Sequence, residues 1–246
     1  MDDWQRTQQQ VIEHWRTRWE DMELTDDPPP AVDGQLVDMV EDHVSAVSGR
    51  IVVDVGCGKG NLAFAFARRG AISICLDTAF AAVAHSVSRI NTDALDARGV
   101  VGSGFSLPFS DNSIDIVVSG GLLEHFDRAL RVEMLKEMKR VSRGCVVAMV
   151  PNGLDPFYRF AKWHLQATDR WPWGREHSLQ GLGEEFAAAG LSVRYEGSYD
   201  FHNSAQLFGK ALDLKSEQTR ALLQWARQGP AGAHWCGYRL VSIGIP

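Results

Sequence analysis

The chain has 246 residues, of which 45% are apolar and 23% charged, and its formal net charge is −6. This length and apolar content predict one well-buried α/β domain with additions, rather than two full domains. The acidic balance excludes a broad basic surface for nucleic acid and favours small-molecule chemistry.

Targeting and cysteine signals are both weak. No apolar run reaches the ~18–20 residues of a membrane-spanning helix, and the stretch Met1–Trp4 is acidic rather than signal-like. We therefore expect a cytoplasmic protein without integral membrane contact. Four widely spaced cysteines show no Cys-x-x-Cys pattern, so we expect buried thiols and no metal site: Cys57, Cys75, Cys145 and Cys236.

The first predicted element is an amphipathic helix over residues 3–22, whose apolar stripe is Val11, Ile12, Trp15, Trp19 and Met22. The run Pro28-Pro29-Pro30 ends any helix there. Residues 1–30 are thus expected to form either a helical lid with a proline linker or a packed extra helix. A second helix near residues 33–47 opens the main domain, expected over residues 31–246.

The stretch Ile51–Val55 is a β-branched run, and Gly56, Gly58 and Gly60 follow it before an apolar helix begins. This order predicts a strand, a tight loop and a helix. Glycine at alternate positions allows left-handed backbone angles and leaves no Cβ between the main chain and a ligand. The stretch therefore predicts a ligand cradle, the alternative being an ordinary strand-to-helix turn.

The next predicted strand, residues 71–76, ends at Asp77. An acidic side chain at this point can accept hydrogen bonds from the two hydroxyls of a ribose. It can also act as the N-cap of the helix predicted over residues 80–90, and one side chain can do either.

Strands and helices continue to alternate to residue 150. Strands are predicted near residues 100–101, at 114–119 and at 145–150, with a helix from Leu130 to Val141 before the last of them. Because the strands are almost continuously apolar, they imply a mostly parallel sheet with helices on both faces. Ligands of such sheets sit at the carboxyl ends of the strands.

An aromatic insert, residues 151–178, interrupts this alternation. Four further elements are predicted after it: a helix at 178–189, a strand at 191–199, a helical stretch at about 204–228 and a strand at 235–245.

Four motifs in this order resemble those of class I S-adenosylmethionine-dependent methyltransferases: Asp54–Gly60, Asp77, Leu107–Asp115, and Leu123-Glu124-His125-Phe126. The resemblance covers roughly residues 35–200 and is closest to the small-molecule branch that includes ubiquinone and menaquinone methyltransferases. It implies a Rossmann-like α/β fold with a seven-stranded, mostly parallel sheet whose last strand is antiparallel. It also implies S-adenosyl-L-methionine as cofactor and a small-molecule acceptor.

The resemblance assigns cofactor roles. The three glycines would face the methionine part, Asp54 would support its amino group and Asp77 would bind the ribose. Ser103 stands where the family commonly has an aspartate that accepts from adenine N6, and Arg18 would pair with the cofactor carboxylate. The cofactor set is Trp15, Arg18, Asp54, Gly56, Cys57, Gly58, Gly60, Asp77, Thr78, Ser103, Gly104, Phe105 and Gly120.

A general base is optional, because a sulfonium already carries an activated methyl group and positioning does much of the work. His125 and His177 are candidate bases, since histidine titrates near neutrality, although each is as well explained by a structural role. Glu124 is similar to a glutamate that lines the transfer site of related lipid-modifying enzymes. An apolar or aromatic acceptor, or a cation, is expected against the insert's rings: Phe157, Tyr158, Trp171 and Trp173.

Three other functions remain to be weighed. A nicotinamide-dependent oxidoreductase would need a third glycine where Asn61 stands. A relative with the same fold can use S-adenosylmethionine without methyl transfer, by cyclising or cleaving it. A non-enzymatic accessory protein would leave the glycine loop and Asp77 without a purpose. The sequence also leaves open whether the chain forms a homodimer.

Overall fold

The computed structural model describes residues 3–22, 32–227 and 237–246. Its elements in chain order are α1 (Asp3–Asp21), α2 (Val32–His43), β1 (Ile51–Val55), α3 (Asn61–Ala67), β2 (Ile72–Asp77), α4 (Phe80–Thr92), β3 (Ala97–Val101), β4 (Ile114–Gly120), the 3-10 turn η1 (Leu123–His125), α5 (Arg128–Val141), β5 (Ser142–Pro151), α6 (Pro156–Ala167), α7 (Gly183–Ala188), β6 (Ser192–Tyr199), α8 (Phe201–Ala211), α9 (Ser216–Arg227) and β7 (Arg239–Ile245).

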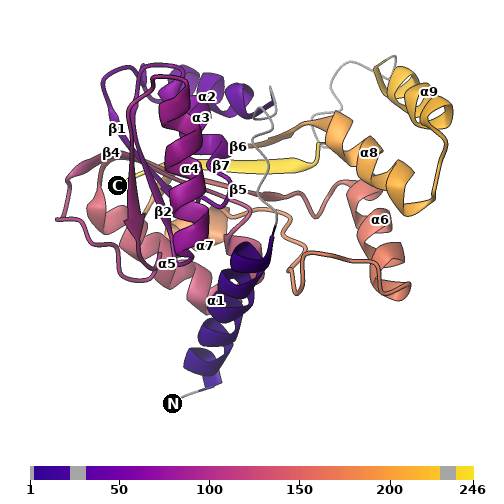
Figure 1. The fold of residues 1–246 in the computed structure, drawn as a ribbon, viewed down its shortest axis with the longest axis horizontal. Helices are drawn as coiled ribbons and strands as arrows, with labels where there is room; N and C mark the ends of the chain where they lie inside the picture. The colour runs from indigo at the N-terminus through magenta and orange to yellow at the C-terminus, as the bar shows by residue number, and fades with distance from the viewer. Residues whose placement is uncertain (1–2, 23–31, 228–236) are drawn as a thin grey trace.

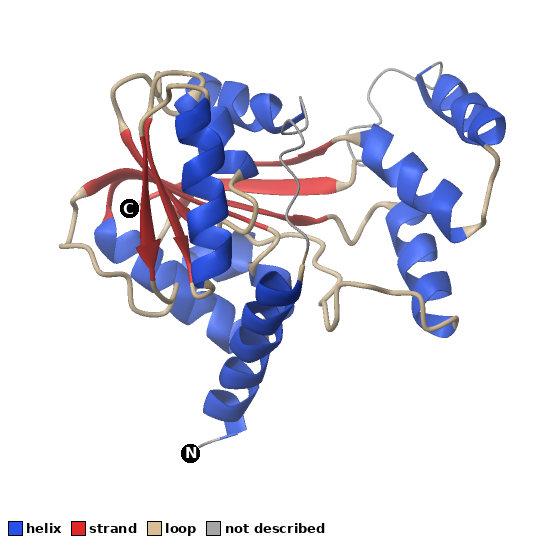
Figure 2. Ribbon diagram, viewed as in Figure 1, coloured by secondary structure: helices blue, strands red, loops and turns tan. Residues whose placement is uncertain are grey.

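The strands form one seven-stranded sheet in the order β3-β2-β1-β4-β5-β7-β6 (Figure 2). Strands β1 to β5 pair in parallel, and β7 runs antiparallel to both β5 and β6. The predicted mostly parallel sheet with an antiparallel last strand is thus confirmed. The chain winds outward from β1 in both directions, so a crevice opens beside the carboxyl ends of β1 and β4.

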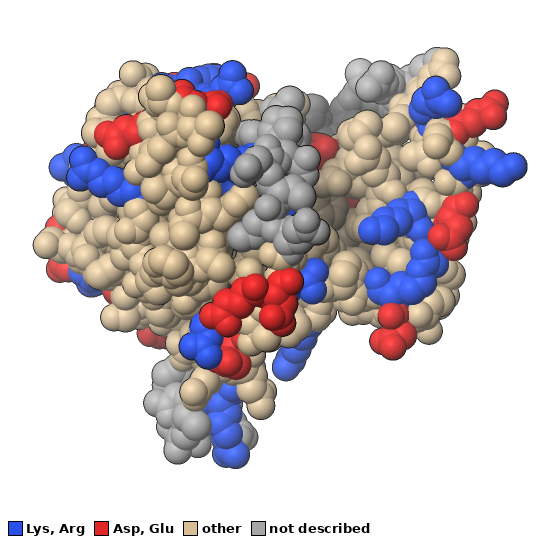
Figure 3. All heavy atoms as spheres, in the orientation of Figure 1, with Lys and Arg blue, Asp and Glu red and all other residues tan. Residues whose placement is uncertain are grey.

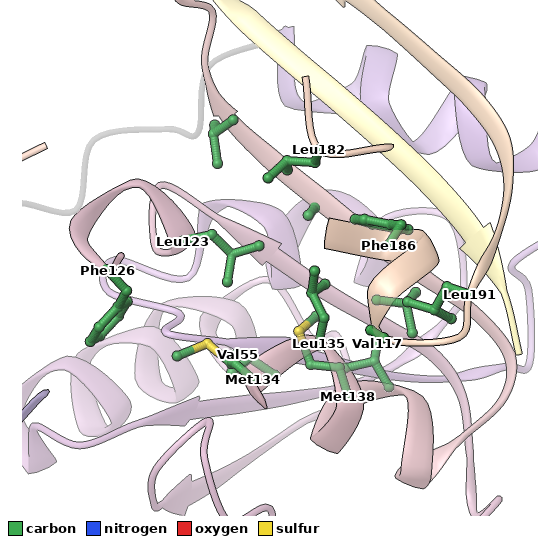
Figure 4. Close-up of a cluster of buried hydrophobic side chains, with 14 of the residues drawn as sticks. Val55, Val117, Leu123, Phe126, Met134, Leu135, Met138, Leu182, Phe186 and Leu191 are labelled. Carbon is green, nitrogen blue, oxygen red and sulfur yellow. The ribbon is translucent and has the colours of Figure 1, made fainter. Parts of the chain in front are cut away.

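Alternation along the central strand divides the core into two layers. Val53 and Val55 of β1 face α5 and α7, where Met134, Met138 and Phe186 fill the space (Figure 4). Val52 points to the opposite face, into the cluster of α2 and α3. Because side chains of a strand alternate in direction, the apolar residues of β1, which are all of its residues except Asp54, bury both faces of the sheet.

Helices α6, α8 and α9 gather at one side of the molecule, away from the helices that flank the sheet (Figure 1). Asp155 begins α6 as its N-cap by accepting from N of Tyr158, and its other oxygen accepts from the Ser204 hydroxyl of α8. Phe157 packs edge-on against Phe201 and Phe208 of α8. Helix α6 of the insert and helix α8 thus pack together around a small core of their own.

Some predicted helices are longer than the real ones. Residues 178–182 are not helical, because Leu179 bridges Asn152 and its carbonyl accepts from N of Gly153, so α7 begins only at Gly183. The stretch 204–228 is two helices, α8 and α9, with Asp213 between them at a positive φ of 52°. The second helix ends at His43 rather than near residue 47.

Three of the four cysteines, Cys57, Cys75 and Cys145, are buried free thiols as expected. The fourth, Cys236, lies outside the described residues, as do the proline run and the start of the predicted strand 235–245. Among the described residues, no helix has the length and apolarity needed to cross a bilayer. On the face drawn in Figure 3, basic and acidic side chains of the described residues are interspersed rather than separated by sign.

Candidate active site

A cavity of about 530 Å³ lies at the carboxyl ends of the parallel strands. Its floor consists of the loops that follow β1, β2, β3 and β4, and α1 covers it with Val11, Ile12, Trp15, Trp19 and Met22. The far wall includes Trp173 and Glu176 from the insert and Tyr238 from the segment before β7. The lid stripe, the glycine loop and the insert therefore meet at one site.

The glycine loop has the backbone that the sequence predicts. Gly56, Gly58 and Gly60 have φ values of 72°, 49° and 72°, which residues with a Cβ rarely adopt. A Cβ on Gly58 would approach Cζ2 of Trp19 to 2.6 Å. Glycine is required there both for the turn and for the close approach of the lid.

Asp77 lines the cavity and supports the loop. Its Oδ2 accepts from N of Gly58 at 3.1 Å, and its Oδ1 accepts from N of Ala79 at 3.0 Å at the start of α4. Burial raises the pKa of this carboxyl, and the backbone hydrogen bonds oppose that shift. The N-cap of α4 is Ala79 and no side chain caps this helix, so the predicted capping role of Asp77 is wrong. Asp77 instead holds the backbone at Gly58 and Ala79, and its carboxylate is part of the cavity wall.

Asp54 is the second acidic group of the cofactor end. Its Oδ2 accepts from N of Ala63 at 3.1 Å, at the start of α3. Burial raises the pKa of Asp54 to about 7, and the nearby carboxylates of Asp77 and Asp33 add to the shift. A buried acid with this pKa suits a position where a ligand brings its own positive charge.

The third loop, after β3, lies across the cavity from the glycines. Ser103 forms an isolated bridge with Ser106, and its hydroxyl accepts from N of Phe105 at 3.3 Å. Phe105 packs edge-on against Phe126 at 5.2 Å between ring centroids. A Cβ on Gly104 would approach Cγ1 of Val55 to 2.9 Å, so this loop is seated tightly on β1.

Glu124 and His125 reach the cavity from η1. The His125 Nδ1 lies 2.9 Å from the carbonyl of Arg175, which can only accept, so Nδ1 carries the proton and Nε2 keeps its lone pair. Burial lowers the pKa of His125 to about 4, which leaves the ring neutral. Burial, with the charge of Glu176, raises the pKa of Glu124 well above its ordinary value.

Glu176 closes this end of the cavity from the insert. Its Oε2 accepts from the Tyr158 hydroxyl at 3.0 Å and lies 3.4 Å from Nζ of Lys162. Lys162 also donates to the Glu176 carbonyl at 2.9 Å. Within the described part of the chain, the candidate ligand set for a metal is Glu124, His125 and Glu176, whose ligand atoms lie within 4.8 Å of one another.

Most predicted site residues line this one cavity. They are Trp15, Asp54, Gly56, Cys57, Gly58, Asp77, Thr78, Ser103, Gly104, Phe105, Gly120, Glu124, His125 and Trp173. The remaining predicted residues lie outside the lining: Arg18, Gly60, Phe157, Tyr158, Trp171 and His177.

The residues outside the lining have other partners. The Arg18 guanidinium lies over the rings of Trp15 and Trp173, at 5.6 and 5.3 Å from their centroids. Tyr158 stands behind Glu176, and Trp171 packs beside the Lys162 ammonium at 5.6 Å. His177 bonds through its backbone, donating to the Glu124 carbonyl at 2.7 Å. The predicted acceptor wall of Phe157, Tyr158 and Trp171 is therefore a supporting layer, except for Trp173.

Several lining residues were not assigned to the site from the sequence, among them Asp33, Glu176, Tyr238 and Arg239. The Arg239 guanidinium contacts Asp33 of α2 and Asp200 before α8, which ties three distant segments together. These four residues come together only through long-range packing. Trp19, by contrast, lies on the predicted helical stripe with Trp15, and both line the cavity.

Comparison with known proteins identifies the domain. Residues 52–144 match a family model described as a methyltransferase domain. An uncharacterized methyltransferase of Mycobacteroides abscessus is 35% identical over 116 residues, 46% of this chain and 44% of that protein. A demethylmenaquinone methyltransferase of Thermobifida fusca is 31% identical over 132 residues, 52% of this chain and 56% of that protein. The chain thus spans about half the length of these relatives.

Solved structures share the fold over most of the chain. The cyclase SpnF has a TM-score of 0.59 at 23% identity, covering 87% of this chain and 80% of that one. A geranyl diphosphate C-methyltransferase of Streptomyces coelicolor A3(2), in complex with Mg²⁺, geranyl diphosphate and S-adenosyl-L-homocysteine, has a TM-score of 0.62 at 14% identity, covering 95% and 96%. The chain therefore has the fold of these structures, and its residues 52–144 resemble a methyltransferase domain. S-adenosylmethionine is the cofactor of class I methyltransferases, which the sequence motifs resemble.

The cavity residues fit this cofactor. Gly58 has no Cβ and only the Trp19 ring lies over it, so a ligand that displaces this ring can touch the backbone directly. The buried carboxyl of Asp54 lacks the cation that would lower its pKa, and the amino group of a bound cofactor would supply one. Asp77 stands at the end of β2, where a ribose is expected.

Proposed function

We propose that this protein transfers a methyl group from S-adenosylmethionine to a small-molecule acceptor. The observation that carries the proposal is the continuity of the cavity, which joins the glycine loop and Asp77 to the buried groups of Glu124 and Glu176. Its volume of about 530 Å³ falls within the ~300–1,000 Å³ typical of small-molecule sites. A cofactor and an acceptor can therefore lie in contact, away from bulk water.

When bound, the cofactor supplies an activated methyl group on a sulfonium. The task of the chain is to orient the acceptor and to exclude water. Trp15 and Trp19 supply the cover, and Glu124 and the Nε2 of His125 are the groups placed to take a proton from the acceptor. His177 is a less direct base, because it reaches Glu124 through its backbone.

The proposed acceptor has an apolar or aromatic body. Support comes from the rings of Trp15, Trp173 and Tyr238 in the lining, which make flat apolar walls. The Thermobifida fusca relative, by its name, acts on a quinone-type molecule, which agrees with such an acceptor.

The test is to incubate the purified chain with S-adenosylmethionine, alone and with metabolite fractions, and to identify every cofactor-derived product by mass spectrometry. S-adenosylhomocysteine that forms only with a fraction present supports methyl transfer. Methylthioadenosine in place of S-adenosylhomocysteine would assign the protein to cofactor cleavage or cyclisation and overturn the proposal.

A further inference from the structure

The acceptor end of the cavity holds three buried hydrogen-bond acceptors from two distant segments. Glu124 and His125 belong to η1, and Glu176 belongs to the insert. Two bonds fix the segments side by side: the His125 ring to the Arg175 carbonyl, and N of His177 to the Glu124 carbonyl. The side chains of Glu124, His125 and Glu176 are only 3%, 4% and 5% exposed. The cluster is thus a built feature of the wall.

The charges of this cluster do not balance. Glu176 has a counterion in Lys162 and a donor in the Tyr158 hydroxyl. Glu124 has neither: its Oε2 is buried without a hydrogen-bond partner. Its Oε1 lies 3.9 Å from Nε2 of His125, too far for a hydrogen bond, and that ring is neutral. A buried carboxylate without a cation is costly, so the ionised form of Glu124 needs a ligand that brings a positive charge.

The spacing of the acceptor atoms can be compared with the spacing that two kinds of cation require. An ammonium group donates at tetrahedral angles to acceptors about 2.8 Å away, which places those acceptors about 4.6 Å apart. Ligands about 2.1 Å from a tetrahedral metal ion lie only about 3.4 Å apart. Here one pair is 3.9 Å apart and all three lie within 4.8 Å. The cluster can hold an ammonium after a small outward shift of Glu124 from His125, and a tetrahedral metal would require a small shift inward, so the charge has to distinguish the two.

The charge count favours the ammonium. With Glu124 and Glu176 both ionised, the Lys162 ammonium leaves one net negative charge, which a monocation neutralises and a divalent ion would exceed. An anionic acceptor finds no open partner here: Arg239, a described basic residue in this part of the lining, is already bonded to Asp33 and Asp200. Aromatic walls complete the fit, because the Trp15 ring lies 4.8 Å from the His125 ring and favours a cation over its face.

We propose that the acceptor is a primary or secondary amine with an apolar body, held as its ammonium by Glu124, His125 and Glu176. This inference rests on the proposed methyl transfer. The nitrogen gives one proton to Glu124 and turns about its C–N bond. Its freed electron pair then forms the N–CH₃ bond as the S–CH₃ bond breaks, with the electron pair of that bond staying on sulfur.

The test is calorimetric titration of the full chain, saturated with S-adenosylhomocysteine, with 2-phenylethylamine, 2-phenylethanol and 3-phenylpropionate. The amine is expected to bind at least tenfold more tightly than the alcohol, and the anion more weakly than either. Glu124→Gln keeps the shape but removes the charge, so it is expected to lose at least tenfold in amine affinity. Its affinity for S-adenosylhomocysteine is expected to stay within twofold. Glu184→Gln, at an exposed site on α7, is the matched control and leaves both unchanged.

Two outcomes overturn the inference alone, with S-adenosylhomocysteine still bound. One is equal affinity for the amine and the alcohol. The other is tight binding of Zn²⁺ or Mn²⁺, without any amine, that Glu124→Gln abolishes, because this would make the cluster a metal site. Failure of the chain to bind S-adenosylhomocysteine overturns the proposed function, and the inference falls with it.

Discussion

The indole of Trp19 lies directly over Gly58, so close that a Cβ on Gly58 would come within 2.6 Å of Cζ2 of the ring. Helix α1 and the glycine loop are therefore in close contact at this point. Since both line the cavity, a cofactor lying along the loop must contact the underside of this indole or displace it.

Gly58→Ala is expected to weaken S-adenosylhomocysteine binding by at least tenfold. The left-handed φ of 49° costs a residue with a Cβ about 1–2 kcal/mol, and the methyl group collides with Trp19. Calorimetry measures the loss. Gly34→Ala is the control, because nothing lies within 4 Å of its Cβ position in α2 and the change is expected to stabilise the fold by about 0.5–1 kcal/mol. Unchanged affinity of Gly58→Ala would remove the loop from the cofactor site.

Features of the site could be predicted from the sequence where they depend on residues that are close together in the chain. The glycine loop was predictable, because the need for positive φ is a property of three nearby residues. Asp115 belongs to the motif Leu107–Asp115, which resembles a motif of the methyltransferases, but its side chain has a structural role. It accepts from N of Ile51 and from the Arg143 guanidinium and is not part of the cavity lining.

In the insert, the sequence alone does not show which residues face the cavity. Its aromatic content predicted a wall, but which residues face inward depends on Lys162 and Tyr158 of α6, which hold Glu176 toward the cavity. His177, the predicted residue, is the next one along the chain and lies outside the lining. No periodic pattern in a non-helical stretch distinguishes the two neighbours, so only the folded contacts could.

Asp77→Ala is expected to weaken S-adenosylhomocysteine binding by about 1.5–3 kcal/mol, the scale of hydrogen bonds to a charged group. The substitution removes the ribose acceptor and also the bond that holds N of Gly58. Asp93→Ala, an exposed position at the end of α4, is the control. An unchanged affinity with lowered thermal stability would restrict Asp77 to holding the backbone at Gly58 and Ala79.

Cofactor binding is expected to depend on pH through Asp54. Its pKa is raised to about 7 without a ligand, and the amino group of the cofactor lowers it, so binding releases a proton. Affinity is therefore full above pH 7 and falls as the pH drops below 7, where Asp54 is protonated. Calorimetry in buffers of different ionisation enthalpy measures the proton release near pH 7. Asp54→Asn is expected to abolish the release, and a variant that releases protons as the wild type does would contradict this assignment.

Asp115→Asn is expected to lower the free energy of unfolding at neutral pH. The Arg143 guanidinium lowers the pKa of Asp115 to about 2, from an ordinary 3.8, despite the opposing effect of burial. A lowered folded-state pKa stabilises the fold above pH 3.8, and this contribution disappears as the pH falls from 3.8 towards 2. Urea unfolding of wild type and variant should show a difference that shrinks in that window. A difference independent of pH would mean that packing, not charge, explains the loss.

The first helix is expected to act as a cover rather than as part of the core. A variant lacking residues 1–30 should still unfold cooperatively, because the two main core clusters lie between the sheet and helices α2, α3, α5 and α7. It should lose at least tenfold in affinity for S-adenosylhomocysteine, since Trp19 no longer covers Gly58 and Trp15 no longer covers His125. Thermal melts and calorimetry measure the two effects separately.

Point variants keep this prediction testable even where the truncated chain aggregates. Trp15→Ala and Trp19→Ala each remove an indole from the cavity lining while leaving the rest of α1 in place. Both are expected to weaken S-adenosylhomocysteine binding, Trp19→Ala more strongly because its ring lies on the glycine loop itself. Arg16→Ala, on the exposed side of the helix, is the matched control. Wild-type affinity in both tryptophan variants, with a large drop in melting temperature, would make α1 a packed extra helix.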